Sequence, residues 1–273
     1  MGLSAPSSPA KSDTFRERDS LVVAAAYAAG AAVAAAAVAI GVGLAAYGWK
    51  DVAWVLSAAG SQSVLRALGM TAIIVITALP VTVSVALFAA AAANDTSIGG
   101  ITGPAVRESI QWSSGIPPVV VGLAVFFCTI VVRGDQAVVA AVAALVLLNL
   151  PNAAARLAQA FGTVPRDARE AAAALGASPT ASYFALVQPA AAWAVAAAVF
   201  SLAAQMVGET SAVAVAVSAS DGPEPLSVQI WHYASNISMA GTEAAACIVL
   251  VATIAILTGV ARACARRNIG ATR

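Results

Sequence analysis

The side chains that are able to do chemistry are few and scattered along this sequence. The chain has one histidine, His232, so a catalytic or metal site that needs two imidazoles is excluded. Its three cysteines, Cys128, Cys247 and Cys264, lie in or beside apolar runs. That setting is typical of small residues in membrane helices rather than of a disulfide framework or a metal site. We therefore expect no catalytic residue, no bound metal and no cofactor in this chain.

Charged side chains mark two places where other chemistry is expected. The segment "REAAAALGASPTASYFALVQPA", residues 169–190, begins with a polar stretch that suits contact with water or with a protein partner. Glu209 lies within a long apolar run, where an isolated carboxylate costs several kcal/mol. We expect Glu209 to face the protein interior or to be protonated. It can gate a pathway, hold a neighbouring cationic group, or make a helix-packing hydrogen bond with Thr210 or another neighbour.

Composition indicates what kind of protein must position these residues. Of the 273 residues, 60% are hydrophobic and 10% are charged, whereas about a quarter of the residues in a soluble domain are charged. The deficit extends over the whole length and indicates a polytopic, all-α membrane protein in a lipid bilayer. The formal net charge of +1 argues against a nucleic-acid partner, because there is no basic field to attract one.

Each membrane-spanning helix needs about 20 apolar residues, and we expect six such helices. The first apolar run is too long for a signal-peptide core, so we interpret it as a retained helix. The third and fourth runs are separated only by Arg133, Gly134 and Asp135, which we interpret as a polar turn rather than an adhesion motif. The predicted spans are residues 21–47, 66–93, 112–132, 136–155, 188–217 and 242–262.

The distribution of lysine and arginine predicts the orientation, because cytoplasmic loops are rich in both. If the N-terminus is inside, only Lys50, Arg66 and Arg133 fall on the outer side. Both termini are then cytoplasmic, with a flexible tail over residues 1–20, a transmembrane domain over 21–265 and a short tail over 266–273. The basic residues on the inner side are Lys11, Arg16, Arg18, Arg107, Arg156, Arg166, Arg169, Arg262, Arg266, Arg267 and Arg273.

Residues 156–190 predict two short helices joined by a sharp bend. Thr163 is expected to cap the first helix, with Pro165 inside its first turn, where no amide donor is missed. Four consecutive alanines favour the helix, and Gly176 ends it because glycine readily adopts the left-handed conformation of C-caps. Pro179 begins the second helix, and Pro189 marks its turn into the fifth span. The first helix presents four charged residues to water or to a partner: Arg166, Asp167, Arg169 and Glu170.

This pattern resembles the Glu-Ala-Ala loop of the membrane subunits of ATP-binding-cassette (ABC) importers. In that family the first short helix is a coupling helix, which docks into a cleft on a separate ATPase subunit. The resemblance implies that Arg166 and Arg169 flank or join the docking motif, and that the chain is a transport subunit rather than an enzyme. The residues that match the motif are Glu170, Ala171, Ala172, Gly176, Leu186 and Pro189, whereas Gln188 stands where leucine is usual.

Further segments resemble the permeases of phosphate importers, and the likeness extends from about residue 64 to the end. They are "GIPPVVVGL" (115–123), "TVPRDAREAAAALGAS" (163–178), "GETSAV" (208–213) and "EPLSVQIW" (224–231). The last segment and the short length favour the A-type subunit of that family, whereas "GETSAV" favours the C-type. The resemblance implies a MetI-like, type I importer fold in a bacterial plasma membrane. It implies three partners: an ATPase dimer, a second permease subunit or second copy of this chain, and an extracytoplasmic substrate-binding protein.

Gln205 is the main departure from the phosphate-importer pattern. That family usually has an arginine here, four residues before the glutamate that corresponds to Glu209. An arginine attracts an anion and balances the acid better than glutamine does. We place Gln205, Glu209 and Thr210 in the expected translocation pathway. Three explanations of the departure stay open: the partner permease supplies the positive charge, the solute differs, or the chain is a diverged paralogue.

The segment 218–241 is the longest predicted non-cytoplasmic loop. The resemblance makes it a docking surface for the binding protein, and an interfacial re-entrant segment is an equal alternative. Trp231 and Tyr233 suit the membrane interface, and His232 is most simply an interface residue as well.

Three functions are therefore in contention for the whole chain. The first is an importer permease for phosphate or a similar oxyanion. The second is a permease of the same fold for molybdate, sulfate or an organic solute, which Gln205 keeps open. The third is an ion-coupled carrier or channel. The two lysines, Lys11 and Lys50, do not lie in a phosphate-binding Gly-Lys-Ser/Thr motif, so we expect ATP hydrolysis to come from another chain.

Overall fold

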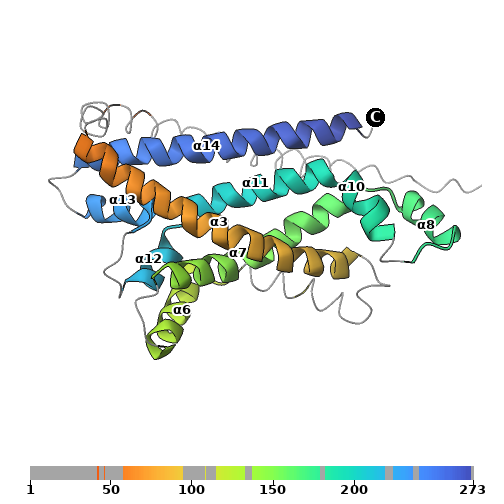
Figure 1. Ribbon diagram of the computed structural model, residues 1–273, viewed down its shortest axis with the longest axis horizontal. Coiled ribbons are helices and arrows are strands. Elements are labelled where there is room, and N and C mark those ends of the chain that lie inside the picture. Colours follow the sequence, from red (N-terminus) through yellow and green to blue (C-terminus); the bar gives the residue numbers. More distant parts are fainter. Residues whose placement is uncertain are drawn as a thin grey trace, which may run out of the picture.

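The structure is a computed structural model, and helices are the only regular elements in the part of the chain that it describes (Figure 1). The all-α prediction is therefore confirmed. The predicted N-terminal tail, nearly all of the first span and the turn at 133–135 lie outside the described residues. Those residues are 42, 46, 58–94, 108, 115–132, 137–178, 182–218, 224–235 and 240–271.

Three long helices form the frame, and they lie lengthwise in the molecule (Figure 1). They are α3 (Ala58–Asn94), α7 (Ala137–Gly162) and α14 (Ala240–Ala271). Each contains an apolar stretch that is long enough to cross a bilayer, at the places of the second, fourth and sixth predicted spans, and the fourth continues to Gly162, past its predicted end at residue 155. These stretches are Gln62–Ala91, Ala137–Gly162 and Ala246–Arg267. Pro80 and Pro151 lie inside α3 and α7, and both helices continue past them.

The run predicted as the fifth span consists of separate helices. The short α10 (Gln188–Ala190) is followed by α11 (Ala192–Gly208) and then by α12 (Ser211–Val217). The axes of α11 and α12 differ by 55°. Residues 209–210 separate the two helices and have no helical assignment. A single span over 188–217 is therefore corrected to a helix that is broken near its end.

The described part of the third predicted span is α6 (Pro118–Val132), which at 15 residues is shorter than a bilayer requires. It packs against α12 with a very close approach at Gly122. A Cβ atom at that position would lie only 2.4 Å from the backbone oxygen of Ala212. The glycine therefore allows α6 and α12 to contact each other through their backbones.

The predicted loop over 218–241 contains a helix, α13 (Leu226–Ala234). Its first residues are buried, and Leu226 has no exposed surface at all. The backbone N–H of Leu226 donates to Thr71 Oγ1 on α3 at 2.9 Å. Trp231, one and a half turns further on, is 59% exposed. One end of α13 is thus part of the core, and the other faces outward.

The core is built largely from alanine, as the composition predicts. Small side chains let the helix axes approach closely, which suits association in a membrane, where lipid provides no hydrophobic drive between helices. Larger groups such as Phe161, Leu145 and Met206 fill the remaining volume. The alanines with no exposed surface include Ala78, Ala86, Ala90, Ala141, Ala144, Ala191, Ala212 and Ala246.

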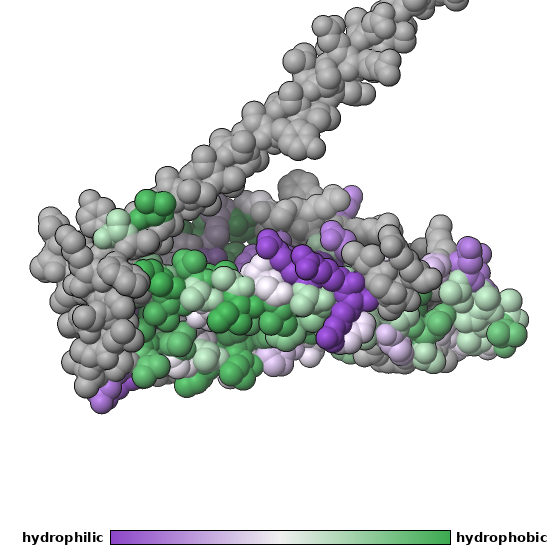
Figure 2. Space-filling view, turned by 90° about the horizontal axis from the view of Figure 1, so that it is seen from above, coloured by the Kyte–Doolittle hydropathy of each residue, from purple (hydrophilic) through white to green (hydrophobic). Residues whose placement is uncertain are grey.

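α14 runs alongside α11 (Figure 1), and aliphatic side chains on α14, Leu250, Ile254 and Leu257, pack against the core. Near the C-terminal end of α14, the guanidinium of Arg267 lies 5.0 Å from the ring centroid of Trp193, at the start of α11. A cation over an aromatic face is attracted by the ring quadrupole. Other α14 side chains, Val251 and Ile256, are exposed. Figure 2 shows that apolar residues cover broad parts of the face seen there.

Candidate functional site

The elbow, residues 163–178, projects beyond the ends of α7 and α11 (Figure 1). Its helix α8 (Arg166–Ala174) begins directly after Pro165, whose backbone is extended. The Thr163 hydroxyl donates to the Ala160 carbonyl at the end of α7, at 2.7 Å. The predicted cap at Thr163 is therefore wrong, because this hydroxyl closes the preceding helix instead. Pro165 stands at the N-cap position of α8 rather than inside its first turn.

The end of α8 confirms the predicted glycine cap. Gly176 has φ +81°, the left-handed conformation that favours glycine. Its N–H donates to the Ala173 carbonyl at 2.9 Å, and the N–H of Ala177 donates to the Ala172 carbonyl at 3.0 Å. This pair of bonds is a Schellman motif, which satisfies carbonyls that a helix end leaves open. Nothing lies within 4 Å of a Cβ built on Gly176, so only its backbone angle requires glycine.

The surface of the elbow carries a mixture of charged and apolar groups. Asp167 and Glu170 are exposed, and Leu175 is 89% exposed. Asp167 lies in the first turn of α8, where a carboxylate interacts favourably with the helix dipole. An exposed leucine beside exposed carboxylates is a surface that a protein partner can bury.

The connection from the elbow into the bundle is helical but irregular. The N–H of Ser182 donates to the Ser178 carbonyl at 2.9 Å, and residues Tyr183–Val187 form a π-helix, η1. α10 then includes Pro189, and α11 begins after the fully buried Ala191. The predicted second helix is therefore present in the described residues from 182 onward, and Pro189 does mark the turn into the bundle.

Glu209 lies at the break between α11 and α12, and its carboxylate caps the second helix. Oε1 accepts a hydrogen bond from the Ser211 hydroxyl at 2.9 Å and another from the Ala212 N–H at 3.3 Å. A carboxylate at a helix N-terminus is stabilised by the open N–H groups and by the helix dipole. These two bonds provide a structural explanation for an acid in an apolar run. The predicted pathway role of Glu209 and Thr210 remains a prediction.

The break is held by neighbouring elements as well. The Ser227 hydroxyl of α13 donates to the backbone oxygen of Glu209 at 3.1 Å. Ser227 is 4% exposed and directly follows Leu226, whose N–H is bound to Thr71 of α3. The start of α13 therefore links the break to α3 through two hydrogen bonds.

Gln205, the third predicted pathway residue, contacts an arginine from another helix. Nη2 of Arg156 on α7 lies 3.4 Å from Oε1 of Gln205 on α11, in a partly buried setting. Arg156 enters the sequence argument only as a charge that sets the orientation. A more specific signal is visible in the sequence, because Arg156 follows three alanines and precedes Leu157, and α7 indeed continues six residues past it.

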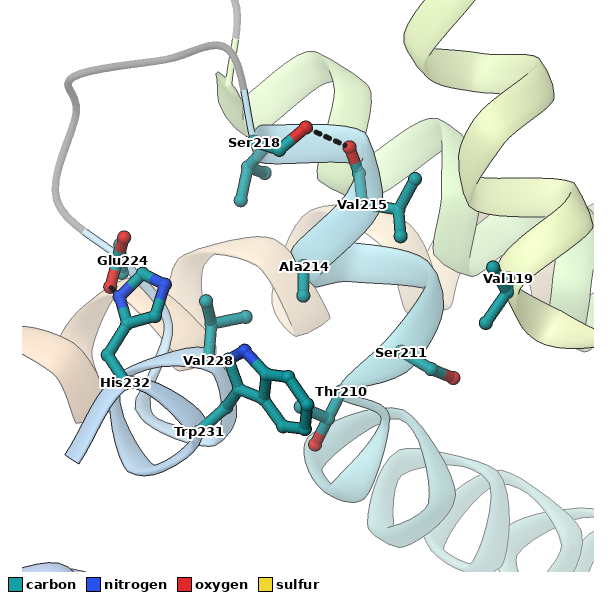
Figure 3. A pocket seen from close by; sticks show the side chains of 11 residues that line it. Val119, Thr210, Ser211, Ala214, Val215, Ser218, Glu224, Val228, Trp231 and His232 are labelled. Carbon is teal, nitrogen blue, oxygen red and sulfur yellow. Dashed lines mark hydrogen bonds and ion pairs between the residues drawn. The ribbon is translucent and has the colours of Figure 1, made fainter. Parts of the chain in front are cut away.

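A cavity of about 580 Å³ (Figure 3) lies beside α12 and α13, at the end of the molecule opposite to the elbow (Figure 1). Side chains from α6, α12 and α13 surround it, including Val119, Ser211 and Trp231. At its edge, Nδ1 of His232 lies 2.8 Å from Oε2 of Glu224. This pair joins α13 to the residue that precedes its N-cap, Pro225, so His232 makes a local contact that the sequence does not predict.

Comparison with known proteins identifies the fold. Residues 55–269 match the family model described as "Binding-protein-dependent transport system inner membrane component". The chain belongs to this family. The permease is thus a membrane subunit of an ABC importer rather than an enzyme, and it works with a separate ATPase and with a partner permease subunit.

One solved structure has the same fold as this permease. It is titled "Inward facing conformations of the MetNI methionine ABC transporter: CY5 native crystal form". The TM-score is 0.57 at 20% identity, over 78% of this chain and 96% of that chain. This likeness confirms the type I importer fold, MetI-like in its arrangement. No curated protein matches the sequence of this permease.

The permease places its predicted site residues at two separate locations. Glu170, Ala171, Ala172 and Gly176 lie together in the elbow, and the backbones of Arg166 and Arg169 belong to the same helix, α8. Gln205, Glu209 and Thr210 lie at the far end of α11. Residues outside the predicted set add polar contacts at the second location: Arg156 to Gln205 and Ser227 to Glu209, while Thr71 holds the neighbouring Leu226.

Proposed function

We propose that this permease imports inorganic phosphate or a closely related oxyanion, and that its elbow receives the movement of the ATPase. The observation that carries the coupling role is the exposed, glycine-terminated α8, which extends beyond the bundle and carries the Glu-Ala-Ala motif. The preference for phosphate comes from the four sequence segments that resemble phosphate-importer permeases.

In the proposed cycle, ATP binding closes the two ATPase subunits, and α8 of each permease subunit moves with the surface on which it docks. The bundle then alternates its opening between the two sides of the membrane. The elbow end faces the cytoplasm, and both termini lie there. The opposite end, with α13 and the cavity of Figure 3, faces outward and receives the substrate-binding protein.

Docking of the ATPase is tested by copurification. The change Leu175→Asp places a charge at a position that is 89% exposed, so the permease folds as before. We expect it to lower recovery of the ATPase subunit, as does Glu170→Arg. Glu224→Arg, at the opposite end of the molecule, is the matched control and leaves ATPase recovery unchanged. Equal recovery with all three variants would rule out α8 as the docking element.

The solute is tested by ATP-driven uptake into proteoliposomes that contain the complete importer. We expect uptake of radiolabelled phosphate that excess unlabelled phosphate abolishes and that methionine leaves intact. Uptake of radiolabelled sulfate or molybdate, without uptake of phosphate, would transfer the role to another oxyanion. Gln205 is the residue that makes this second solute class worth testing, because it replaces the usual arginine.

Orientation is tested by labelling of single cysteines in intact cells. A cysteine introduced at position 174 is expected to react with a membrane-impermeant reagent only after the cells are opened. A cysteine in place of the exposed Ser235 serves as the opposite case and is expected to react in intact cells. Labelling of position 174 from outside would contradict the cytoplasmic position of the elbow.

A further inference from the structure

Arg156 is a half-buried cation with few hydrogen-bond partners among the described residues. A guanidinium has five N–H donors, and the bond found among the described residues joins Nη2 to the neutral Gln205 Oε1 at 3.4 Å. That distance is long for a hydrogen bond, so the contact is weak. In the described part of the chain, no carboxylate oxygen lies within the 4.0 Å of an ion pair with Arg156.

The side chain of Arg156 extends into the bundle rather than toward the elbow. Side chains of a helix tilt toward its N-terminus, and the N-terminus of α7 lies at the end opposite to the elbow (Figure 1). Its partner, Gln205, is three residues before the end of α11 that is remote from the elbow. Arg156 therefore does not reach back to the nearer membrane surface, as a snorkelling arginine does.

The neighbouring acid, Glu209, already accepts hydrogen bonds from other groups. Glu209 follows Gln205 by four residues, but its carboxylate oxygen Oε1 accepts from Ser211 and from the Ala212 N–H at the start of α12. The negative charge is thus compensated by a helix N-terminus, and the positive charge of Arg156 is not compensated by an acid among the described residues. The uncompensated positive charge between α7 and α11 favours the binding of an anion there.

The surroundings of Arg156 raise the strength of any such interaction. The crevice beside it is lined by apolar groups of α3, α7 and α11, including Val83, Ala198 and Leu202, and it has no space for a water molecule. In a dry, apolar setting a charge–charge contact is much stronger than in water. The crevice must open before an anion can enter, as expected for one closed stage of a transport cycle.

We propose that Arg156 binds the transported anion through its guanidinium, and that Gln205 holds this side chain between passages. This proposal rests on the proposed import of an oxyanion. It also explains why glutamine can replace the usual arginine at position 205 without a charge from the partner permease. The positive charge is supplied by Arg156 on α7 instead of by a residue of α11. An arginine suits this task because its planar donors bind the oxygens of a tetrahedral anion in pairs.

The test measures ATP-driven uptake of inorganic phosphate by the complete importer in proteoliposomes. Arg156→Gln is expected to reduce uptake about tenfold or more, the loss of a hydrogen-bonded charge, while ATPase copurification and basal ATP hydrolysis persist. Arg156→Lys retains part of the uptake. The double variant Arg156→Gln/Gln205→Arg, which moves the charge to α11, recovers most of what the single variant loses. Arg262→Gln, an exposed arginine of α14, is the matched control and keeps full uptake.

Two results would overturn this assignment while leaving the proposed function intact. One is wild-type uptake by Arg156→Gln. The other is equal loss in Arg156→Gln, Arg156→Lys and the exchange variant, which would make Arg156 a structural tie between α7 and α11. If the unmodified importer takes up neither phosphate, sulfate nor molybdate, the proposed solute class fails, and the anion site fails with it.

Discussion

The elbow and the break between α11 and α12 are both sharp changes of chain direction, but they are made by different means. At the elbow, Gly176 provides a left-handed backbone angle, and backbone groups close the helix end. At the break, side chains provide the hydrogen bonds: the Glu209 carboxylate caps α12, and the Ser227 hydroxyl donates to the Glu209 carbonyl. The glycine-capped end of α8 is an exposed local structure, whereas the break is built from several elements.

This difference indicates how each region responds to change. A turn closed by its own backbone keeps its shape when its surroundings move, so the elbow can be displaced as a unit by a partner. A turn closed by distant side chains depends on the positions of their helices. The geometry of the break therefore depends on the position of α13 and, through the Leu226–Thr71 bond, on the position of α3. We expect substitutions near the break to change the stability of the whole permease and substitutions in the elbow to change coupling.

The largest effect is expected from Gly122→Ala, on the helix that packs against α12. The new methyl group meets the Ala212 carbonyl oxygen at 2.4 Å, so the backbone must shift. Overpacking of this kind lowers the free energy of unfolding by about 1–3 kcal/mol, measurable by thermal unfolding in detergent. Gly69→Ala is the matched control, because nothing lies within 4 Å of a Cβ there. Equal stability of the two variants would mean that α12 is free to move away from α6.

A smaller loss of stability is expected from Glu209→Ala. The substitution removes the acceptor of the Ser211 hydroxyl and the Ala212 N–H, and loss of a helix cap costs about 0.5–2 kcal/mol. Glu209→Gln retains a carbonyl acceptor and should lie between the wild type and the alanine variant in thermal unfolding. If uptake falls in Glu209→Gln while stability is kept, the carboxylate has a role in transport beyond capping.

Gly176→Ala is expected to separate coupling from stability. An alanine in the left-handed region costs about 1–2 kcal/mol, but the strain is confined to the exposed elbow. Hydrogen exchange should increase in residues 166–177 and stay constant in α3 and α7, and ATPase affinity should fall. Gly176→Asn, which tolerates this conformation better, should lie closer to the wild type. Faster exchange throughout the bundle would contradict the independence of the elbow.

The smallest effect is expected from His232→Gln, at the edge of the cavity shown in Figure 3. The His232–Glu224 contact is close, at 2.8 Å, but the histidine side chain is 54% exposed. Exposed ion pairs contribute less than about 1 kcal/mol, so the unfolding temperature should hardly change. A loss as large as that of Glu209→Ala would show that this pair, like the break, is part of the supporting structure.

The elbow was largely predictable from the sequence because its signals are local. Glycine at a helix end and proline at a helix start act through their own backbone angles, so Gly176 and Pro189 mark the right positions. The error at Thr163 has a local cause too. Pro165 itself takes the N-cap position before Arg166, and the Thr163 hydroxyl is then close enough to the Ala160 carbonyl to bind it.

The break and its contacts were not predictable in the same way. The sequence is apolar on both sides of Glu209, so hydropathy indicates one span where the structure has two helices at 55°. The contact between Arg156 and Gln205 joins residues that are 49 positions apart, and that of Leu226 and Thr71 joins residues 155 apart. Such pairs depend on how the helices pack, which no local spacing encodes.

The stacking of Arg267 on Trp193 has a mechanical consequence. It fastens the last part of α14 to the first turn of α11, directly beside the connection from the elbow. In the proposed coupling, movement of the elbow passes through the π-helix and α10 to the packed pair of α11 and α14, which resists bending more than one helix does. α11 ends at Gly208, so the proposed movement reaches the break between α11 and α12, beside Gln205 and Glu209.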